Sequence, residues 1–270
     1  MSVRGVGLHT GVPVEVILRR EGGPVRFRQG GESARIDQLR VVSTTRATTV
    51  EACSGSLRLS TVEHMLAALA GLGVYSGIVV EVSGPEMPLL DGGASVWCER
   101  IAELRLAPEK PKVQIARRAE FVSAGGSRYE FAPGPAVDVD VRLTLDDDRI
   151  APCASWTGDR VDFRSRIAPA RTFALAADLE NLARLALVRH VERASVVVIA
   201  PDAVYCTGGF LPDEPARHKL LDLVGDMYLH GGPPLGRVHA ERPGHTANAQ
   251  ALQWATAEGV FVPATNALLS

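Results

Sequence analysis

The stretch STVEHMLAALAGLG, residues 60–73, decides how the first half of the chain folds. Its larger apolar side chains recur at the i, i+3, i+4, i+7 spacing of a helix that faces a hydrophobic core: Val62, Met65, Leu66, Leu69 and Leu72. The remaining positions include several alanines, so the helix is apolar almost all round. The pattern predicts a helix over about 61–72 that is buried on more than one side.

The start of this helix allows two interpretations. Ser60 and Glu63 have the spacing of a capping box, which is a purely structural way to begin a helix. Glu63 also stands directly before His64, and an acid next to a metal-binding residue type suits a hydrolase. Since a buried His and Glu need polar partners, a metal ion is one way to supply them. The residues alone leave both interpretations open.

A second helix is predicted within ARHKLLDLVGDMYLHGG, residues 216–232. It places His218 and Asp222 four residues apart, and therefore on one face, with Asp226 a further turn along. An imidazole and a carboxylate at this spacing can bind zinc, although an isolated surface ion pair has the same pattern. His64 would complete a His2Asp set and leave a fourth position open for water, as a catalytic zinc site requires.

The composition is that of an ordinary globular protein, with 46% hydrophobic and 22% charged residues among 270. A formal net charge of -2 gives no electrostatic reason to expect nucleic acid as a partner. No apolar run is long enough to span a membrane, and the first residues lack the apolar core of a signal peptide. The four cysteines are isolated, so we expect a reducing, cytoplasmic setting and no stable membrane anchor.

The order of elements predicts an α+β protein of two domains. Strand patterns, one helix and another strand occupy residues 1–106, which form the N-terminal domain carrying Glu63 and His64. The proline-containing stretch at 106–112 is the best candidate for a linker. Residues 113–270 form the C-terminal domain carrying His218, Asp222 and His245. A helical pattern is also present over roughly 174–187, followed by a buried strand at 195–200.

Two further motifs contain glycine. GVGLHTG, residues 5–11, has its third glycine one position too late for a dinucleotide fingerprint and leads into a strand, so a nucleotide cofactor of that kind is not expected. RPGHTAN, residues 242–248, places His245 after a Pro-Gly turn, in a loop or at the start of a helix. A histidine in such a position is usually solvated, and nothing nearby in the sequence distinguishes this one.

Taken together, these segments resemble the UDP-3-O-acyl-N-acetylglucosamine deacetylases, the zinc amidases of lipid A biosynthesis. Seven motifs occur in the family's order: GVGLHTG, RATTV, STVEHMLAALAGLG, PEMPLLDGGAS, ARTF, RHKLLDLVGD and GHTAN. The resemblance implies two similar α/β units, each a sheet with a helical layer, with the helices sandwiched between the sheets. It places the active site where the two units meet.

The resemblance also implies the site residues. Zinc would be held by His64, His218 and Asp222. Glu63 would be the general base, His245 a general acid or electrostatic stabiliser, and Asp226 the residue that orients His245. The oxyanion, the substrate and the acyl chain would be contacted, in that order, by Thr172, Lys219 and Phe173. The expected partner is a nucleotide-sugar small molecule, possibly acylated, and the default oligomeric state is a monomer.

Three stretches depart from the family pattern. His190, Val191 and Glu192 stand where the family has a Gly-Gly-Ser run beside its acyl passage, and Leu145 is followed by three aspartates instead of a Phe-x-His-Pro turn. Tyr75 and Ser76 replace an aspartate-asparagine pair. Two alternatives therefore stay open beside the family's reaction. One is deacetylation of another N-acetyl sugar without a long acyl chain, and the other is a non-catalytic metal-binding relative.

Overall fold

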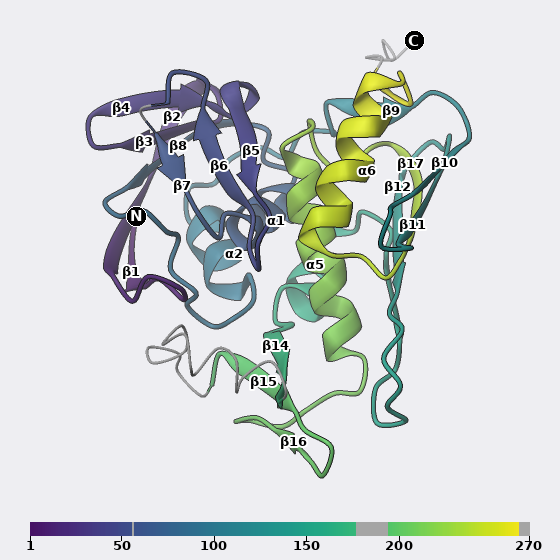
Figure 1. Cartoon of the computed structure of the whole chain (residues 1–270). Helices are drawn as coiled ribbons and strands as arrows, with labels where there is room; N and C mark the ends of the chain where they lie inside the picture. The colour runs from purple at the N-terminus through teal and green to yellow at the C-terminus, as the bar shows by residue number, and fades with distance from the viewer. Residues whose placement is uncertain (56, 177–193, 265–270) are drawn as a thin grey trace.

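The chain folds as an α+β protein in which helices lie between two five-stranded sheets (Figure 1). The computed structural model describes residues 1–55, 57–176 and 194–264. Figure 1 shows the first sheet on the left, the second on the right, and α1 and α5 between them. The predicted fold class is confirmed.

The first sheet has the strand order β1-β2-β8-β3-β4. Neighbouring strands are antiparallel except β3 and β8, which run parallel. Along β2, alternate side chains from Val14 to Leu18 are buried, which places one face of the sheet on the core. The strands are β1 (Ser2–Val6), β2 (Pro13–Pro24), β3 (Arg26–Gln29), β4 (Glu32–Arg35) and β8 (Ser76–Val82).

The second sheet repeats this topology with the order β10-β11-β17-β12-β13. Its central strand is again the last in the sequence, and it is parallel to one neighbour, β12, and antiparallel to the other, β11. The two units are therefore similar in topology, although the sequence shows no short repeat. The strands are β10 (Ala119–Val122), β11 (Arg128–Ala132), β12 (Val137–Arg142), β13 (Cys153–Trp156) and β17 (Gly236–Glu241).

The helices follow the same repeat. In each unit one helix precedes the central strand, α1 (Glu63–Leu72) before β8 and α5 (Glu214–Tyr228) before β17, and these two helices pack against each other. A second helix follows each central strand, α2 (Ser95–Ala102) and α6 (His245–Ala257). Among the described helices, none combines the length and apolar character needed to cross a bilayer.

Each unit also carries a small three-stranded sheet between its fourth strand and the helix that precedes its central strand. In the first unit this sheet contains β5 (Leu39–Ser43), β6 (Thr49–Ala52) and β7 (Arg58–Leu59), and in the second β14 (Thr172–Leu175), β15 (Val196–Ile199) and β16 (Val204–Tyr205). Within the described residues, the other elements are a β9–β18 pair and three short helical turns. They are β9 (Val113–Ile115), β18 (Phe261–Pro263), η1 (Ile36–Gln38), α3 (Arg160–Asp162) and the π-helix η2 (Phe163–Ile167).

The predicted helices agree with the structure at α1 and α5. At the start of the helical pattern over roughly 174–187, Ala174 and Leu175 instead end strand β14, which pairs in parallel with β15. The rest of that segment, together with His190, Val191 and Glu192, lies outside the described residues.

The contact between α1 and α5 is very close at Gly225. A Cβ atom added there would lie 2.1 Å from the backbone carbonyl oxygen of Glu63, a distance that no side chain can occupy. Glycine is therefore required, and it brings the first turn of α1 onto the face of α5 that carries Asp222 and Asp226. The backbone packing of the two units sets the position of the functional residues.

We predict that Gly225→Ala destabilises the protein. Alanine would gain up to about 1 kcal/mol in helix propensity, but overpacking against a backbone atom costs roughly 1–3 kcal/mol or more. The net loss of roughly 1–2 kcal/mol is measured as the change in free energy of unfolding in urea. Gly22→Ala is the control, because no atom lies within 4 Å of a Cβ at that position. Equal stability of the two variants would contradict the packing argument.

Candidate metal centre and acid–base groups

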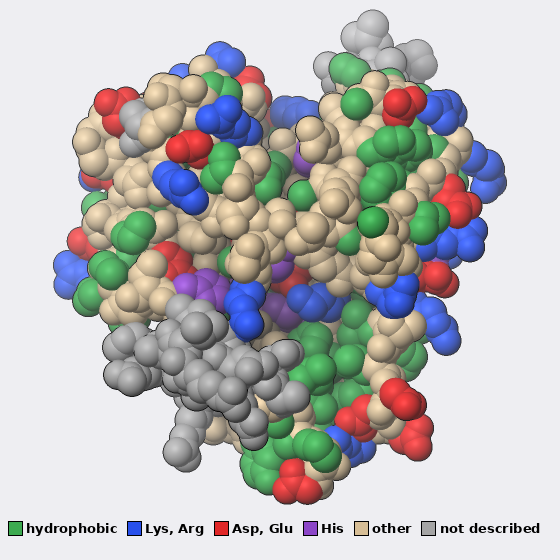
Figure 2. Space-filling view, in the orientation of Figure 1, with side chains coloured by type: hydrophobic (Ala, Val, Ile, Leu, Met, Phe, Trp, Pro, Cys, Tyr) green, Lys and Arg blue, Asp and Glu red, His purple; other side chains and the backbone are tan. Residues whose placement is uncertain are grey.

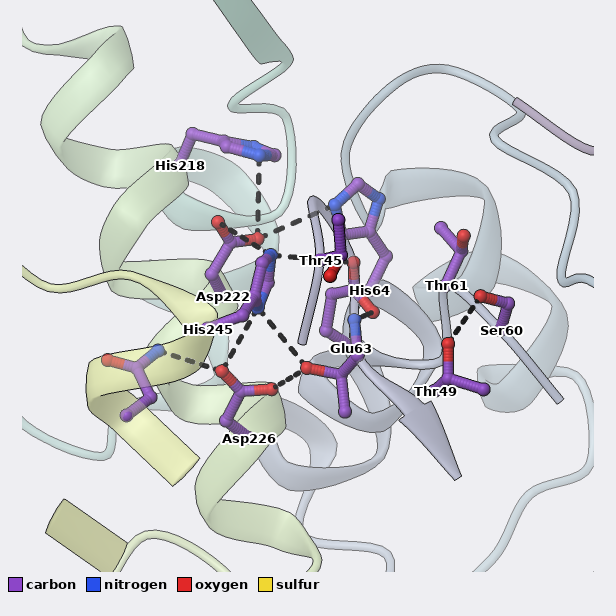
Figure 3. Close-up of polar contacts among 12 residues, drawn as sticks. Thr45, Thr49, Ser60, Thr61, Glu63, His64, His218, Asp222, Asp226 and His245 are labelled. Carbon is purple, nitrogen blue, oxygen red and sulfur yellow. Dashed lines mark hydrogen bonds and ion pairs between the residues drawn. The ribbon is translucent and has the colours of Figure 1, made fainter. Parts of the chain in front are cut away.

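Three side chains from α1 and α5 converge between the two units. The Nε2 atoms of His218 and His64 lie 3.4 Å and 3.6 Å from Oδ1 of Asp222 (Figure 3). All three residues are buried, with 5% or less of each exposed. The predicted i, i+4 pair on α5 thus does share one face, and the packing of α1 on α5 adds His64 to it.

The arrangement fits a metal ion. The three candidate ligand atoms lie within 4.8 Å of one another. Asp222 Oδ1 is buried and has no hydrogen-bond partner, although an unpaired buried carboxylate oxygen is costly. Two nitrogens and one oxygen around a tetrahedral zinc ion would be roughly 3.3 Å apart, close to the 3.4 Å and 3.6 Å from Asp222 Oδ1 to the two imidazole nitrogens. A cation bound by Asp222 Oδ1 would satisfy the unpaired atom.

Neighbouring groups determine the orientation and the protonation of the two histidines. His218 Nδ1 donates to the carbonyl oxygen of Ala170 at 3.0 Å, which leaves Nε2 free to face Asp222. Burial lowers the pKa of His218 to about 3, so its imidazole is neutral, as a ligand must be. Burial alone would lower the pKa of His64, but the contact with Asp222 and the negative charges of Glu63 and Asp222 outweigh it and raise the pKa. Positive charge is therefore stabilised where a metal ion would lie.

Asp222 remains negatively charged in spite of its burial. Burial alone would raise its pKa, but His218 and Lys219 hold it well below the usual range. Lys219 Nζ donates to Asp222 Oδ2 at 2.7 Å and leaves Oδ1 for the metal position. The same ammonium group lies 5.5 Å from the centre of the Phe173 ring. Lys219 and Phe173 therefore border the metal position on one side.

Glu63 lies beside the candidate ligands with one oxygen held and the other facing His245. Its Oε2 accepts a hydrogen bond from the backbone N–H of Thr48 at 3.1 Å. Its Oε1 is 3.7 Å from His245 Nε2. Burial raises the pKa of the Glu63 carboxyl, and the neighbouring His245 only partly offsets this effect. A carboxylate of raised pKa is suited to accept a proton near neutral pH.

His245 begins α6 and faces both Glu63 and Asp222. Its Nδ1 lies 3.1 Å from Asp226 Oδ2, and its Nε2 lies 3.8 Å from Asp222 Oδ2. Burial alone would lower the pKa of His245, but the charges of Asp226, Asp222 and Glu63 raise it to about 9. At neutral pH this imidazole is protonated and can donate from Nε2.

Thr172 lies at the start of β14, next to Phe173, and is half-buried. Its backbone N–H donates to Gly92 O at 2.8 Å, which ties β14 to the first unit. The Phe173 ring lies 6.3 Å from the His218 ring, measured between centres. The structure thus brings both residues to the side of the site where α5 meets the second small sheet.

The capping-box interpretation of Ser60 is wrong. Helix α1 has Val62 at its N-cap with no side-chain hydrogen bond. Thr61 adopts a φ of 57°, which turns the chain before the helix starts and directs Ser60 elsewhere. The Ser60 hydroxyl lies 2.7 Å from the Thr49 hydroxyl, away from the metal position (Figure 3). The Glu63 side chain is therefore free for the site.

Two further residues contact the site but were not singled out from the sequence. The Thr48 hydroxyl donates to Asp226 Oδ1 at 2.6 Å, and Asn248 Nδ2 donates to Asp226 Oδ2 at 2.8 Å. Asn248 follows His245 by three residues, so helical spacing could have identified it. Thr48 gives no such signal, because its loop reaches the site only through the packing of the two units.

Tyr75, one of the departures from the family pattern, has a structural contact in the seam between the units. Its ring stacks on that of Tyr228 with the ring centres 5.3 Å apart. Ser76, the second residue of this departure, donates a hydrogen bond from its hydroxyl to Glu109. Neither contact involves the candidate metal ligands, and the Tyr75–Tyr228 contact joins the two units.

Comparison with known proteins identifies relatives of the whole fold. The family model LpxC, described as UDP-3-O-acyl N-acetylglycosamine deacetylase, matches residues 1–256. A relative from Myxococcus xanthus is 33% identical over 264 residues, covering 92% of this chain and 81% of that protein. A relative from Nostoc sp. is 33% identical, covering 92% of this chain and 93% of that protein. Both carry the name UDP-3-O-acyl-N-acetylglucosamine deacetylase. The chain therefore belongs to the family of UDP-3-O-acyl N-acetylglycosamine deacetylases.

Proposed function

We propose that the protein is a zinc-dependent amide hydrolase that removes acetate from a UDP-3-O-acyl-N-acetylglucosamine in lipid A biosynthesis. Family membership makes it a deacetylase, and the names of its relatives support the nucleotide-sugar substrate. The observation that carries the zinc proposal is the unpaired, buried Asp222 Oδ1 between the Nε2 atoms of His64 and His218.

In this proposal His64, His218 and Asp222 hold the metal. When bound, zinc supplies a Lewis acid that polarises the acetyl carbonyl and lowers the pKa of water from 15.7 to about 7. Glu63 takes the proton from the attacking water at Oε1, because Oε2 is already held by the Thr48 N–H. The raised pKa of Glu63 favours that transfer.

His245, whose Nε2 lies 3.7 Å from Glu63 Oε1, then completes the reaction. Its Nε2 gives a proton to the leaving amine nitrogen while Nδ1 stays bonded to Asp226. The amide C–N bond breaks, and the products are acetate and a free glucosamine amine. We assign stabilisation of the oxyanion to Thr172, substrate contact to Lys219 and contact with the acyl chain to Phe173. The location of Lys219 and Phe173 beside the ligands supports those two assignments.

The proposal extends to the organisation of the chain. Residues 1–106 and 113–270 act as two domains, with the catalytic groups supplied by both, and the repeated sheet topology supports that division. Figure 2 shows histidine and basic side chains side by side along the seam between the two halves, where an anionic nucleotide sugar would enter. Cytoplasmic location and a monomeric state stay predictions.

The first experiment measures acetate release by the zinc-loaded protein from UDP-N-acetylglucosamine with and without a 3-O-acyl group. We expect turnover of the acylated substrate, and Glu63→Gln should lower kcat by about 10²–10⁴-fold while zinc per chain is unchanged. Glu99→Gln, the same change at an exposed position on α2, should leave kcat as in the wild type.

Two results would overturn this assignment. Release unchanged by Glu63→Gln would remove Glu63 as the base. Equal kcat/KM for the two substrates would favour an enzyme for N-acetyl sugars without a long acyl chain.

The dependence of kcat/KM on pH tests the acid–base pair. Activity requires Glu63 deprotonated and His245 protonated, so the profile is a bell with its alkaline limb set by His245. Asp226→Asn removes a charge that raises the pKa of His245, so the alkaline limb should move to lower pH and kcat/KM at pH 8 should fall at least about tenfold.

A matched variant exists on the outer face of the second sheet. Asp140 Oδ1 lies 2.5 Å from His239 Nδ1, a contact of the same type far from the candidate ligands in the fold. Asp140→Asn should leave both limbs in place. An unchanged alkaline limb in Asp226→Asn would contradict the role of Asp226.

A further inference from the structure

Thr48 contacts both halves of the acid–base machinery. It lies just before β6, and only 2% of it is exposed. Its backbone N–H donates to Glu63 Oε2 at 3.1 Å, and its hydroxyl donates to Asp226 Oδ1 at 2.6 Å. Its carbonyl accepts from the N–H of Val62 at 3.4 Å, at the start of α1. The residue is therefore held on the first unit while its hydroxyl reaches α5 of the second.

The hydroxyl has only one proton, and its direction is determined by Asp226. Because that proton is donated to the carboxylate, the Thr48 oxygen presents a lone pair to His245 Nδ1, which lies 3.2 Å away. Asp226 Oδ2, 3.1 Å from the same nitrogen, is also an acceptor. Both neighbours of Nδ1 thus accept, so Nδ1 keeps its hydrogen and Nε2 is the nitrogen that exchanges a proton with the substrate.

The other contacts of Asp226 support this direction of the bonds. Asn248 Oδ1 accepts from the hydroxyl of Tyr129 at 2.6 Å, which fixes the Asn248 amide so that Nδ2 donates to Asp226 Oδ2. Thr48 and Asn248 therefore each donate to one oxygen of the same carboxylate. Asp226 cannot turn without losing one of these donors, and His245 is held in consequence.

We propose that Thr48 is a positioning residue that aligns the base and the acid of the reaction together. Its N–H holds Glu63 so that Oε1 faces the site, and its hydroxyl holds Asp226 and the Nδ1–H tautomer of His245. The inference rests on the proposed function, since it assigns Thr48 a task in that reaction. It adds a link across the seam between the two units that acts through Glu63, Asp226 and His245 and touches no metal ligand.

The neighbouring residue provides a matched control. Thr49 is also buried, at 8% exposure, and its hydroxyl also makes one short side-chain contact, 2.7 Å from the Ser60 hydroxyl. In Figure 3 the Thr49–Ser60 pair lies apart from Glu63, Asp226 and His245. If the Thr48 hydroxyl were only structural, Thr48→Val and Thr49→Val should lower kcat alike. If Thr48 is a positioning residue, Thr48→Val should lower kcat much more than Thr49→Val.

The experiment compares the zinc-loaded wild type with Thr48→Val, Thr48→Ser and Thr49→Val in acetate release. Valine keeps the shape and the backbone N–H but removes the hydroxyl, so Thr48→Val should lower kcat about 10–100-fold with KM within about twofold. Thr48→Ser and Thr49→Val should stay within about threefold of the wild type. Thr48→Val should add no loss in an Asp226→Asn background, because both act through His245.

A spectroscopic readout separates this inference from the proposed function. Nitrogen-15 NMR of labelled histidine should report the Nδ1–H tautomer of neutral His245 in the wild type and a mixture in Thr48→Val. A wild type that releases no acetate would overturn the proposed function, and the tautomer would still test Thr48. Full kcat in Thr48→Val, equal losses in Thr48→Ser or Thr49→Val, or an unchanged tautomer would overturn the role of Thr48.

Discussion

The contact of the first turn of α1 with α5 is the constraint on which the site depends. Gly225 allows the backbone of Glu63 to approach so closely that six ionisable side chains share one space. They are Glu63, His64, His218, Asp222, Asp226 and His245. Each of them would be costly to bury alone, but together they offset one another's charges. Among these groups Asp222 Oδ1 has no hydrogen-bond partner. It lies where a cation would contact both candidate imidazole ligands.

The shifted pKa values divide four of these groups into two pairs. Asp222 has a pKa well below its usual range and His218 one of about 3, so both are in the forms that bind metal. Glu63 and His245 have raised pKa values, one because of burial and the other because of the surrounding carboxylates, so both can transfer protons near neutral pH. Equivalent helices of the two units meet at the seam, and each supplies different side chains.

Local sequence patterns predicted what lies within one element. Apolar periodicity identified α1 and α5, and the i, i+4 spacing placed His218 and Asp222 on one face. The contact between these helices, and with it the position of Thr48 against Asp226, depends on packing between residues far apart in the chain and has no local signal. The capping-box prediction at Ser60 was wrong because Thr61 turns the chain before α1, and the spacing of Ser60 and Glu63 gives no sign of that turn.

The proposed function requires the α1–α5 seam to build a zinc site from one aspartate and two histidines. X-ray absorption at the zinc edge of the loaded protein tests it most directly. We predict two imidazole ligands with oxygen in the remaining positions, all at about 2.0–2.2 Å from the zinc ion. His64→Ala should have one imidazole ligand fewer. A sulfur ligand, or a spectrum unchanged by His64→Ala, would contradict the account.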